Sequence, residues 1–435
     1  MRNIVLPTVL VFMLALSILA YTPVQSQKKH TFINSVKTSV FVLYTRDLDI
    51  PRANLSLFLQ KINESGYELR EANRIFDYSP LERVDALLIL GSKNLDFLDQ
   101  ELIVQFLKEG GSLLIAFPTS NAFEYNNFIL KYFPYRLKGI IKDNSSYYTN
   151  FSEVIINNTA FLRDSPLIRN LTKLIIPNGW GLIRENITAN FTLPYNAYAL
   201  IWGLNSTFID ENNNDYLDKG EISGQNVTCI LIIELYSGGK IIILPSVKML
   251  SNEILSNPLF HNKILAFRII DWLGGRYASI RIKNIQLSTN YVRLDQKNKS
   301  ITVTFIVVDE NDEPVENISS WVCITRLGII VANVTPEQIN QTSYRAIIDF
   351  SNIRVSQGIV YLIILVYKQY YGYYWSSPVA IHIYKSPIPT QGVDYVLLLL
   401  GFVVPIIIGL ALVATAYPEY RRKKKKLKEI CQKIS

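Results

Sequence analysis

The sequence predicts an α/β domain with a parallel sheet, followed by a β-sandwich and one C-terminal transmembrane helix. Strands and helices alternate up to residue 275, and the strands are almost wholly apolar, which is typical of a parallel sheet covered on both faces. Short strands separated by turn residues follow between 280 and 384. Residues 395–416 then form an uncharged apolar run long enough to span a bilayer.

The chain begins with a segment typical of a secretory signal peptide. Arg2 precedes an apolar run over 4–20, and a polar stretch follows. We assign 1–26 as the signal peptide, with cleavage near Ala20 or near Ser26. An uncleaved anchor is the alternative, because 17 apolar residues make a long run for a signal.

Residues 38–278 carry the elements expected for the α/β domain. The expected strands are 39–45, 67–72, 86–90, 112–117, 198–202, 227–235 and 240–244. The expected helices are 55–62, 99–109 and 258–273. Residues 119–180 are polar and rich in Asn and Tyr, and we place an insertion at about 119–226.

Residues 280–385 predict the β-sandwich. Its expected strands are 280–287, 300–308, 321–325, 328–334, 344–350, 359–367 and 379–384. The segment 307–315 resembles the strand–turn–strand of extracellular immunoglobulin-like repeats. We expect an Ig-like architecture without the Cys and Trp pattern of true immunoglobulin domains.

The C-terminal end sets the expected topology. Six consecutive cations at 421–426 predict a basic cytoplasmic tail at 417–435, a single pass through the lipid bilayer, and extracellular N-terminal domains. Residues 418–435 hold eight Lys/Arg and two Glu, which account for +6 of the net charge of +8. The remainder is almost neutral, so the composition argues against nucleic acid as a partner.

Fourteen N-glycosylation sequons lie in the part expected outside the membrane. They start at Asn54, Asn63, Asn144, Asn150, Asn157, Asn170, Asn186, Asn190, Asn205, Asn226, Asn298, Asn317, Asn333 and Asn340. This density predicts a glycosylated surface protein and resembles that of archaeal cell-surface glycoproteins. Chance matches in a chain rich in Asn, Ser and Thr are the alternative. The three Cys are too few for a disulfide framework.

Three blocks of the α/β domain carry a family resemblance. They are VDALLILG at 84–91, FLKEGGSLLI at 106–115, and GGKIIILPS at 238–246 with IIDWLGG at 269–275. These blocks resemble class I glutamine-amidotransferase-like domains, of the non-catalytic type in gliding-motility and intraflagellar-transport proteins and in membrane-anchored prokaryotic homologues. The resemblance implies a flavodoxin-like parallel sheet over 38–278.

The catalytic residues of that family are not matched. Catalytic members carry a Cys at a strand-to-helix elbow, with His and Glu partners. Here Pro118-Thr119-Ser120-Asn121 follows the strand, Cys229 lies within an expected strand, and His261 is the one His of the domain. Because nucleophilic catalysis needs a nucleophile beside a base, we expect no amidotransferase or peptidase activity.

An acidic segment at 210–221 matches the spacing of an EF-hand calcium loop. Its candidate ligands are Asp210, Asn212, Asn214, Tyr216 (through the backbone carbonyl), Asp218 and Glu221. Five carboxylates and one Lys give −4 in twelve residues, which favours a bound cation. Position 6 is Asp215, where an EF-hand loop has Gly. Asp can adopt the left-handed conformation that this position needs, at some cost in free energy. We predict a structural Ca²⁺ site outside an EF-hand; a solvated turn is the alternative.

A second candidate site is the carboxyl edge of the parallel sheet, where open α/β folds bind ligands. Polar residues follow four expected strands: Arg46, Asp47, Ser92, Lys93, Thr119, Ser120 and Ser246. Ordinary loop residues are the alternative. A third feature, six aromatic residues within 367–375, predicts either a sugar- or partner-binding strip or a tyrosine-rich hairpin.

Together these features predict a non-enzymatic, glycosylated, single-pass cell-surface protein that binds a ligand or a protein partner. By analogy of fold it would serve a membrane transport or envelope complex. The alternative is an extracellular hydrolase with a carboxylate-based site at the sheet edge, for example Asp47, which would require buried carboxylates with a raised pKa there.

Overall fold

The structure is a computed structural model that describes residues 39–75, 79–93, 95–186, 194–353 and 355–385. In these residues strand accounts for 42% and helix for 20%. The chain divides into two compact units. The first runs to Val292 and resumes from Asn298 to Ile383; the second joins Arg293–Lys297 to the chain from Tyr384 onward. Both the first domain and the β-sandwich therefore belong to the first unit.

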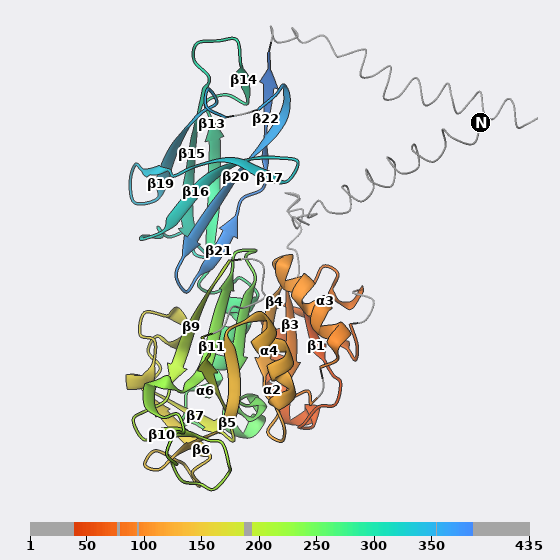
Figure 1. Ribbon diagram of the computed structural model, residues 1–435, viewed down its shortest axis with the longest axis vertical. Helices are drawn as coiled ribbons and strands as arrows, with labels where there is room; N and C mark the ends of the chain where they lie inside the picture. The colour runs from red at the N-terminus through yellow and green to blue at the C-terminus, as the bar shows by residue number, and fades with distance from the viewer. Residues whose placement is uncertain (1–38, 76–78, 94, 187–193, 354, 386–435) are drawn as a thin grey trace, which may run out of the picture. The chain divides into compact units, whose positions relative to one another are not determined.

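The first domain is built on one sheet of ten strands (Figure 1). Its strands are β1 (Val40–Tyr44), β2 (Glu68–Ala72), β3 (Ala86–Leu90), β4 (Ser112–Ala116), β5 (Tyr135–Asp143), β8 (Trp180–Arg184), β9 (Tyr195–Trp202), β10 (Thr207–Asp210), β11 (Thr228–Leu235) and β12 (Lys240–Leu244). The strand order is β10-β5-β8-β11-β12-β4-β3-β1-β2, and β9 also pairs with β11.

The expectation of an α/β domain with a parallel sheet is wrong for half of this sheet. Strands β2, β1, β3, β4 and β12 run parallel. Beyond β12 every pairing is antiparallel. The reason lies in the connection between β11 and β12: residues 236–239 can close a hairpin, whereas a parallel connection needs a dozen or more residues. The segment expected as an insertion supplies β5, β8, β9 and β10 to the sheet.

Helices cover both faces of the sheet. On one face lie α2 (Ser56–Glu64), α5 (Asn252–Leu255) and α6 (Asn262–Leu273), and on the other α3 (Phe97–Lys108) and α4 (Asn126–Tyr132). Alternate residues of β1 point to opposite faces, so Phe41 packs with the first group and Val42 with the second. A separate hairpin pairs β6 (Glu153–Asn157) with β7 (Lys173–Pro177). The short 3₁₀ helices are η1 (Arg52–Leu55), η2 (Ser79–Leu81), η3 (Phe123–Tyr125), η4 (Asn158–Ala160), η5 (Pro166–Ile168), η6 (Gly224–Asn226) and η7 (Val247–Leu250).

Two antiparallel sheets follow as a β-sandwich. One has the order β13-β15-β19-β18, and the other the order β14-β22-β20-β16-β17 with β21 paired to β20. Their bounds are β13 (Ile280–Leu287), β14 (Tyr291–Arg293), β15 (Ser300–Asp309), β16 (Ser319–Arg326), β17 (Ile329–Val334), β18 (Glu337–Gln338), β19 (Ser343–Asp349), β20 (Gly358–Lys368), β21 (Gly372–Trp375) and β22 (Val379–Tyr384). Buried residues alternate with partly exposed ones along most of β15 and with exposed ones along most of β19, so each strand presents one face to the core.

The membrane predictions need correction. The expected signal peptide at 1–26, the transmembrane helix at 395–416 and the basic tail at 417–435 lie outside the described residues. Within the described ranges no helix has both the length and the apolar character to cross a membrane. Helices α3 and α6 have 12 residues each, about 18 Å, against a hydrocarbon core of about 30 Å. The single-pass topology and the extracellular location are therefore withdrawn.

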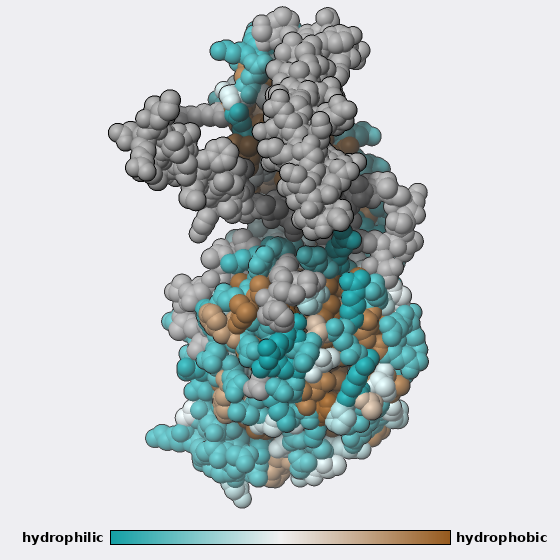
Figure 2. Space-filling view, turned by 90° about the vertical axis from the view of Figure 1, so that its right-hand side faces the viewer, coloured by the Kyte–Doolittle hydropathy of each residue, from teal (hydrophilic) through white to brown (hydrophobic). Residues whose placement is uncertain are grey.

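The sequons lie on the surface. All of the predicted acceptor residues that the structure describes are exposed, and Asn190 lies outside the described residues. Figure 2 shows that hydrophilic side chains cover most of the described surface on that face, with apolar patches between them. Because Asn is a surface residue in most proteins, exposure alone does not establish glycosylation, and the sequons stay a prediction.

Candidate functional site

The acidic loop 210–221 begins at the last residue of β10. Asp210 is 2% exposed, whereas the rest of the acidic residues of the loop point outward or along its surface. The carboxylate of Asp210 turns back into the loop, where Oδ1 accepts the backbone N–H of Asn214 at 3.2 Å and Oδ2 that of Asp215 at 3.0 Å. This contact folds the first half of the loop around a single carboxylate.

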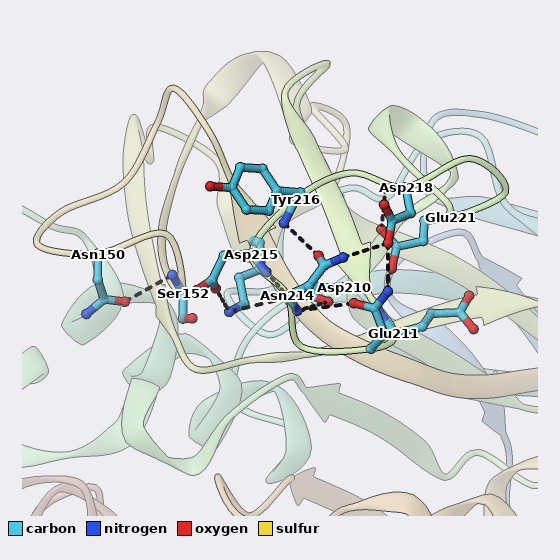
Figure 3. Close-up of polar contacts among 11 residues, drawn as sticks. Asn150, Ser152, Asp210, Glu211, Asn214, Asp215, Tyr216, Asp218 and Glu221 are labelled. Carbon is cyan, nitrogen blue, oxygen red and sulfur yellow. Dashed lines mark hydrogen bonds and ion pairs between the residues drawn. The ribbon is translucent and has the colours of Figure 1, made fainter.

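The remaining side chains converge on the second half of the loop (Figure 3). Asn212 and Asn214 both donate an amide N–H to Asp218 Oδ2, at 2.6 and 2.7 Å. Glu221 closes the loop, because its Oε1 accepts the backbone N–H of Glu211 at 2.9 Å and its Oε2 that of Asp218 at 3.0 Å. Three of the six predicted ligands, Asn212, Asn214 and Asp218, thus meet through their side chains, whereas the carboxylates of Asp210 and Glu221 bind backbone N–H groups of the loop.

Three loop residues have a positive φ, Asn213, Asp215 and Gly220 (φ 104°), and the EF-hand spacing requires one only at position 6, which is Asp215. Asp215, at the position where an EF-hand loop has Gly, has φ 66°, and Asn213 has φ 61°. Asn and Asp visit this region more readily than other residues with a side chain. The departure at position 6 is therefore accommodated without Gly.

Strand β5 supplies two lysines to the loop that the sequence pattern did not reveal. The buried Lys142 ammonium lies 3.5 Å from Asp210 Oδ2 and also contacts Asp215. Lys138 lies 3.5 Å from Glu211 Oε2 near the surface. The strand also carries Arg136 and Asp143, so the charge of these lysines gave no distinct signal in the sequence. These cations offset the charge of Asp210, Asp215 and Glu211, and among the described residues Asp218 and Glu221 form no ion pair.

The donor set fits calcium only if amide and carbonyl oxygens take part. In the part of the chain that the structure describes, no group of three His, Cys, Asp or Glu side chains is placed to hold a metal ion. The loop would have to add the side-chain oxygens of Asn212 and Asn214 and the Tyr216 carbonyl, which are the oxygen ligands that Ca²⁺ accepts. Both amides would then have to turn their oxygens inward.

The apex of the loop carries apolar side chains. Tyr216 is 72% exposed and Leu217 is 48% exposed, and the Tyr216 ring points away from the carboxylates (Figure 3). Beside Glu221 lies an open groove of about 430 Å³, lined by Ile183, Arg184, Glu221, Ile222, Ser223 and Asn226. The loop therefore combines an ordered acidic interior with an exposed apolar tip.

At the carboxyl edge of the parallel strands, the predicted residues Lys93, Thr119 and Ser120 lie close together. They surround Asp49, which was not among the predicted site residues. Asp49 Oδ2 accepts the backbone N–H of Thr119 at 2.6 Å and also its hydroxyl. Its Oδ1 accepts the Ser120 hydroxyl at 3.0 Å and lies 3.5 Å from Lys93 Nζ. The edge is thus held together by its own polar groups.

Burial raises the pKa of Asp49, but the hydrogen bonds from Thr119 and Ser120 and the charge of Lys93 outweigh it, so the pKa is lowered. The stabilisation from this carboxylate is present above its ordinary pKa and is lost as the pH falls through the lowered one. A general acid would need the opposite shift.

The other predicted edge residues make contacts outside the Asp49 network. The Ser92 hydroxyl donates to the Arg46 carbonyl oxygen at 2.8 Å, and the Arg46 guanidinium contacts Asp96. Asp47 is exposed, with an Oδ2 3.7 Å from Arg46 Nε. Ser246 caps η7, since its hydroxyl oxygen accepts the backbone N–H of Lys248 at 3.2 Å. The structure does not bring Ser246 into the Asp49 network.

The aromatic segment 367–375 packs against the first domain. It forms the end of β20 and the strand β21, and the Trp375 indole donates to the Tyr236 carbonyl oxygen at 2.7 Å. The Asn196 amide donates to the Tyr373 hydroxyl at 2.9 Å, and the Tyr367 and Tyr373 rings stack at 4.4 Å. The aromatic rings thus serve a contact inside the first unit, not a free strip.

Comparison with known proteins gives a coarse likeness of fold. No protein-family model matches the chain, and no curated protein matches it. The mmIFT52 N-terminal domain is similar at 16% identity over 55% of this chain and 97% of that one, with a TM-score of 0.41. A ThuA-like protein from Bacteroides uniformis is similar at 11% identity over 56% of this chain and 95% of that one, with a TM-score of 0.31.

A third solved structure covers both parts of the chain. Alpha-L-fucosidase isoenzyme 2 from Paenibacillus thiaminolyticus is similar at 10% identity over 72% of this chain, with a TM-score of 0.32, and the chain spans 47% of that protein. With TM-scores below 0.5, none of the three carries an argument about function. Nothing found supports the likeness to archaeal cell-surface glycoproteins.

Proposed function

We propose that this chain is a non-enzymatic binding module whose loop 210–221 is ordered by Ca²⁺ and presents its apolar tip to a protein partner. The observation that carries the proposal is the hydrogen-bonded order of one oxygen-rich loop. In it Asn212 and Asn214 donate to Asp218, and the carboxylates of Asp210 and Glu221 accept backbone N–H groups of the loop. Such an oxygen-rich loop binds calcium with a Kd on the order of 0.1–1 mM in structural modules.

The exposed tip supports the binding role. A cation inside the loop would fix the backbone on which Tyr216 and Leu217 stand, so that both side chains are held ready for contact. Ordering the loop before the partner arrives lowers the entropy lost on association. No second function is proposed, because the lowered pKa of Asp49 and the exposure of Asp47 do not favour acid catalysis at the sheet edge.

The test is a calcium titration of the full chain after treatment with a chelator. We expect the unfolding midpoint to rise and heat to be released, with half-saturation at about 0.1–1 mM. At about 10 mM Ca²⁺, mass action predicts about 1.4–2.7 kcal/mol of added stability. The effect should vanish in Asp210→Ala and Glu221→Ala.

Asp312→Ala is the matched control, because Asp312 is an exposed acid in a turn of the sandwich. This variant should keep the full calcium response. Absence of any midpoint change and of any heat up to about 10 mM would remove calcium from the proposal.

A further inference from the structure

A buried acid and a buried base lie where the first domain meets the β20–β21 hairpin. Glu234 and Lys240 are cross-strand partners in the antiparallel pair β11–β12. Glu234 is 0% exposed and Lys240 is 7% exposed. The Lys240 ammonium donates to the Trp272 carbonyl oxygen at 3.2 Å and lies 4.7 Å from the centre of the Trp272 ring. Neither residue belongs to the acidic loop or to the sheet edge.

The Glu234 carboxyl has too few partners for a buried anion. The Tyr367 hydroxyl, on β20, donates to Glu234 Oε2 at 3.2 Å, and Glu234 Oε1 has no hydrogen-bond partner. The Tyr367 and Tyr198 hydroxyls are 2.7 Å apart, so a chain of two hydroxyls leads away from the carboxyl. A buried carboxylate is costly unless it is paired and hydrogen-bonded, and the neutral acid costs much less.

We propose that Glu234 makes the contact between β11 and the β20–β21 hairpin a pH-sensitive clasp, closed when its carboxyl is protonated and loosened when the carboxyl ionises. The clasp consists of Glu234, Tyr198, Tyr367, Tyr373 and Trp375, which join the first domain to the hairpin.

The proton has a defined place in each state. In the protonated state the Glu234 carboxyl donates to the Tyr367 oxygen, and the Tyr367 hydroxyl donates to Tyr198. When Glu234 releases its proton to solvent, Tyr198 donates to Tyr367 and Tyr367 donates to the carboxylate. Both directions are available because a phenol hydroxyl donates and accepts. The ionised state is the weaker one, because Oε1 then carries charge without a donor.

Five residues face Glu234. They are Tyr198 on β9, Lys240 on β12, Tyr367 on β20, Tyr370 in the turn between β20 and β21, and Tyr373 on β21. Burial raises the pKa of Glu234 to about 8, opposed by Lys240, the Tyr367 hydroxyl and the Tyr370 backbone amide. Burial lowers the pKa of Lys240 to about 8, opposed by Glu234 and Glu310. Burial raises the pKa of each of these tyrosines, so they remain protonated.

The sign of the pH effect follows from these shifts. Because the closed clasp holds the Glu234 proton more tightly than a solvent-exposed Glu does, closure is favoured at acidic pH and weakens as the pH rises from about 4.5 to about 8. The lowered pKa of Lys240 has the opposite effect at higher pH. Because the closed clasp favours neutral Lys240, closure becomes more favourable again as the pH rises from about 8 to about 10.5. The clasp should therefore be weakest near pH 8.

The test is hydrogen exchange of the backbone amides of 367–375 in the full chain, between pH 5 and pH 8. The rate in wild type is divided by the rate in Glu234→Gln at each pH, which cancels the intrinsic pH dependence of exchange. Gln has the shape of the protonated acid and cannot ionise. We expect a ratio that is lowest at pH 5 and rises about threefold to tenfold per pH unit, as linkage to one proton predicts. A ratio that stays constant across this range overturns the proposal.

Further measurements distinguish a true pH effect from misfolding of the Glu234→Gln variant. Amides of β3, in the first sheet, should be equally protected in both proteins, and the exposed control Glu313→Gln should give a ratio of 1 throughout. Infrared difference spectroscopy of the wild type, which needs no variant to fold, should show a protonated carboxyl that loses its proton between pH 5 and pH 8. A spectrum in which no carboxyl titrates there would also overturn the proposal.

Discussion

Lys142 shows how much of a site can depend on one residue that no motif identifies. Its side chain is 5% exposed, and it joins β5 to Asp210 and Asp215 at the two ends of the first turn of the loop. Lys138 lies four residues earlier in β5 and pairs with Glu211. The Lys138 side chain is 30% exposed. The two lysines have the same charge but differ in burial, which separates structural pairing from surface pairing.

Replacing Lys142 by Met should leave the Asp210 carboxylate buried without its cation. We expect Lys142→Met to lower the free energy of unfolding by about 3–5 kcal/mol in chelator, as for other broken buried pairs. Added Ca²⁺ should restore part of that loss, because it supplies the missing positive charge. The measurement is chemical denaturation with and without calcium.

Lys138→Met is the matched control, and it should cost less than about 1 kcal/mol, because exposed ion pairs contribute little. Equal losses in the two variants would mean that the buried pair has no special role.

The candidate sites could be predicted only in part from the sequence at this scale. Spacing alone located the acidic loop, since its ligands are close together in the chain. At the sheet edge, Asp47 was chosen because it follows the first expected strand, whereas the structure places Asp49 at the centre of the network. Two acids two residues apart share a pattern, and only the path of the chain after β1 decides which one turns inward.

At the scale of elements, β5 is the support of the acidic loop. It pairs antiparallel with β10, and Gly139 in β5 lies against the end of β10, where a Cβ atom would be 2.2 Å from the Asp210 carbonyl oxygen. Such a distance is not possible without a shift of the backbone, so the close approach of the two strands requires Gly at this position.

We expect Gly139→Ala to separate β5 from β10 at the base of the loop. The overpacking should cost about 1–3 kcal/mol of stability, and the calcium response should weaken because Asp210 moves. Thermal unfolding and calcium titration together provide the measurement.

Arg136→Ala tests whether any change in β5 has this effect, since Arg136 is partly exposed and pairs with Glu185 at 3.4 Å. It should leave the calcium response intact. If Gly139→Ala bound calcium with unchanged affinity, the loop would not depend on the spacing of these strands.

The limits of sequence-based prediction are also clear at the element scale. The predicted bounds of β3, β12, β13 and β22 coincide with those in the structure, because apolar runs between turn residues mark a strand well. Such apolar runs do not show whether a strand pairs parallel or antiparallel with its neighbour. For β11 the short link 236–239 was the signal, and it outweighs the apolar composition that suggested a parallel strand.

At the scale of the whole molecule, the hairpin 367–375 gives the sandwich a second attachment to the first domain. The chain itself passes between them near Ala278 and Ser279, whose backbone N–H groups both donate to Glu310 at 3.0 Å. The hairpin adds the contact through Trp375 and its neighbours, from a part of the chain about 100 residues further on. The two parts of the first unit should therefore unfold together.

We expect Trp375→Ala to uncouple them. Loss of the indole removes its hydrogen bond to Tyr236 and the edge-on packing of the two rings, whose centres are 5.0 Å apart. Truncation of a fully buried Trp costs about 3–5 kcal/mol, so the loss for the partly buried Trp375 should be smaller, and it falls on the contact between the two parts. Calorimetry should then show two transitions in place of one.

The control is Tyr361→Ala, which removes an exposed aromatic residue of the same strand, β20. It should keep a single transition. A single transition in Trp375→Ala as well would mean that the hairpin contact contributes little to cooperativity.

The order of strands in the first sheet has a consequence for synthesis on the ribosome. Strand β4 has β3 on one side, but its other neighbour is β12, and the paired residues Leu113 and Ile241 are 128 residues apart in the chain. At about 5–20 residues per second, β4 waits about 6–25 s with one edge unpaired, and all of its residues except Ser112 are apolar. During translation that edge is a natural place for a chaperone to bind, and pauses in translation between the two strands would lengthen the exposure.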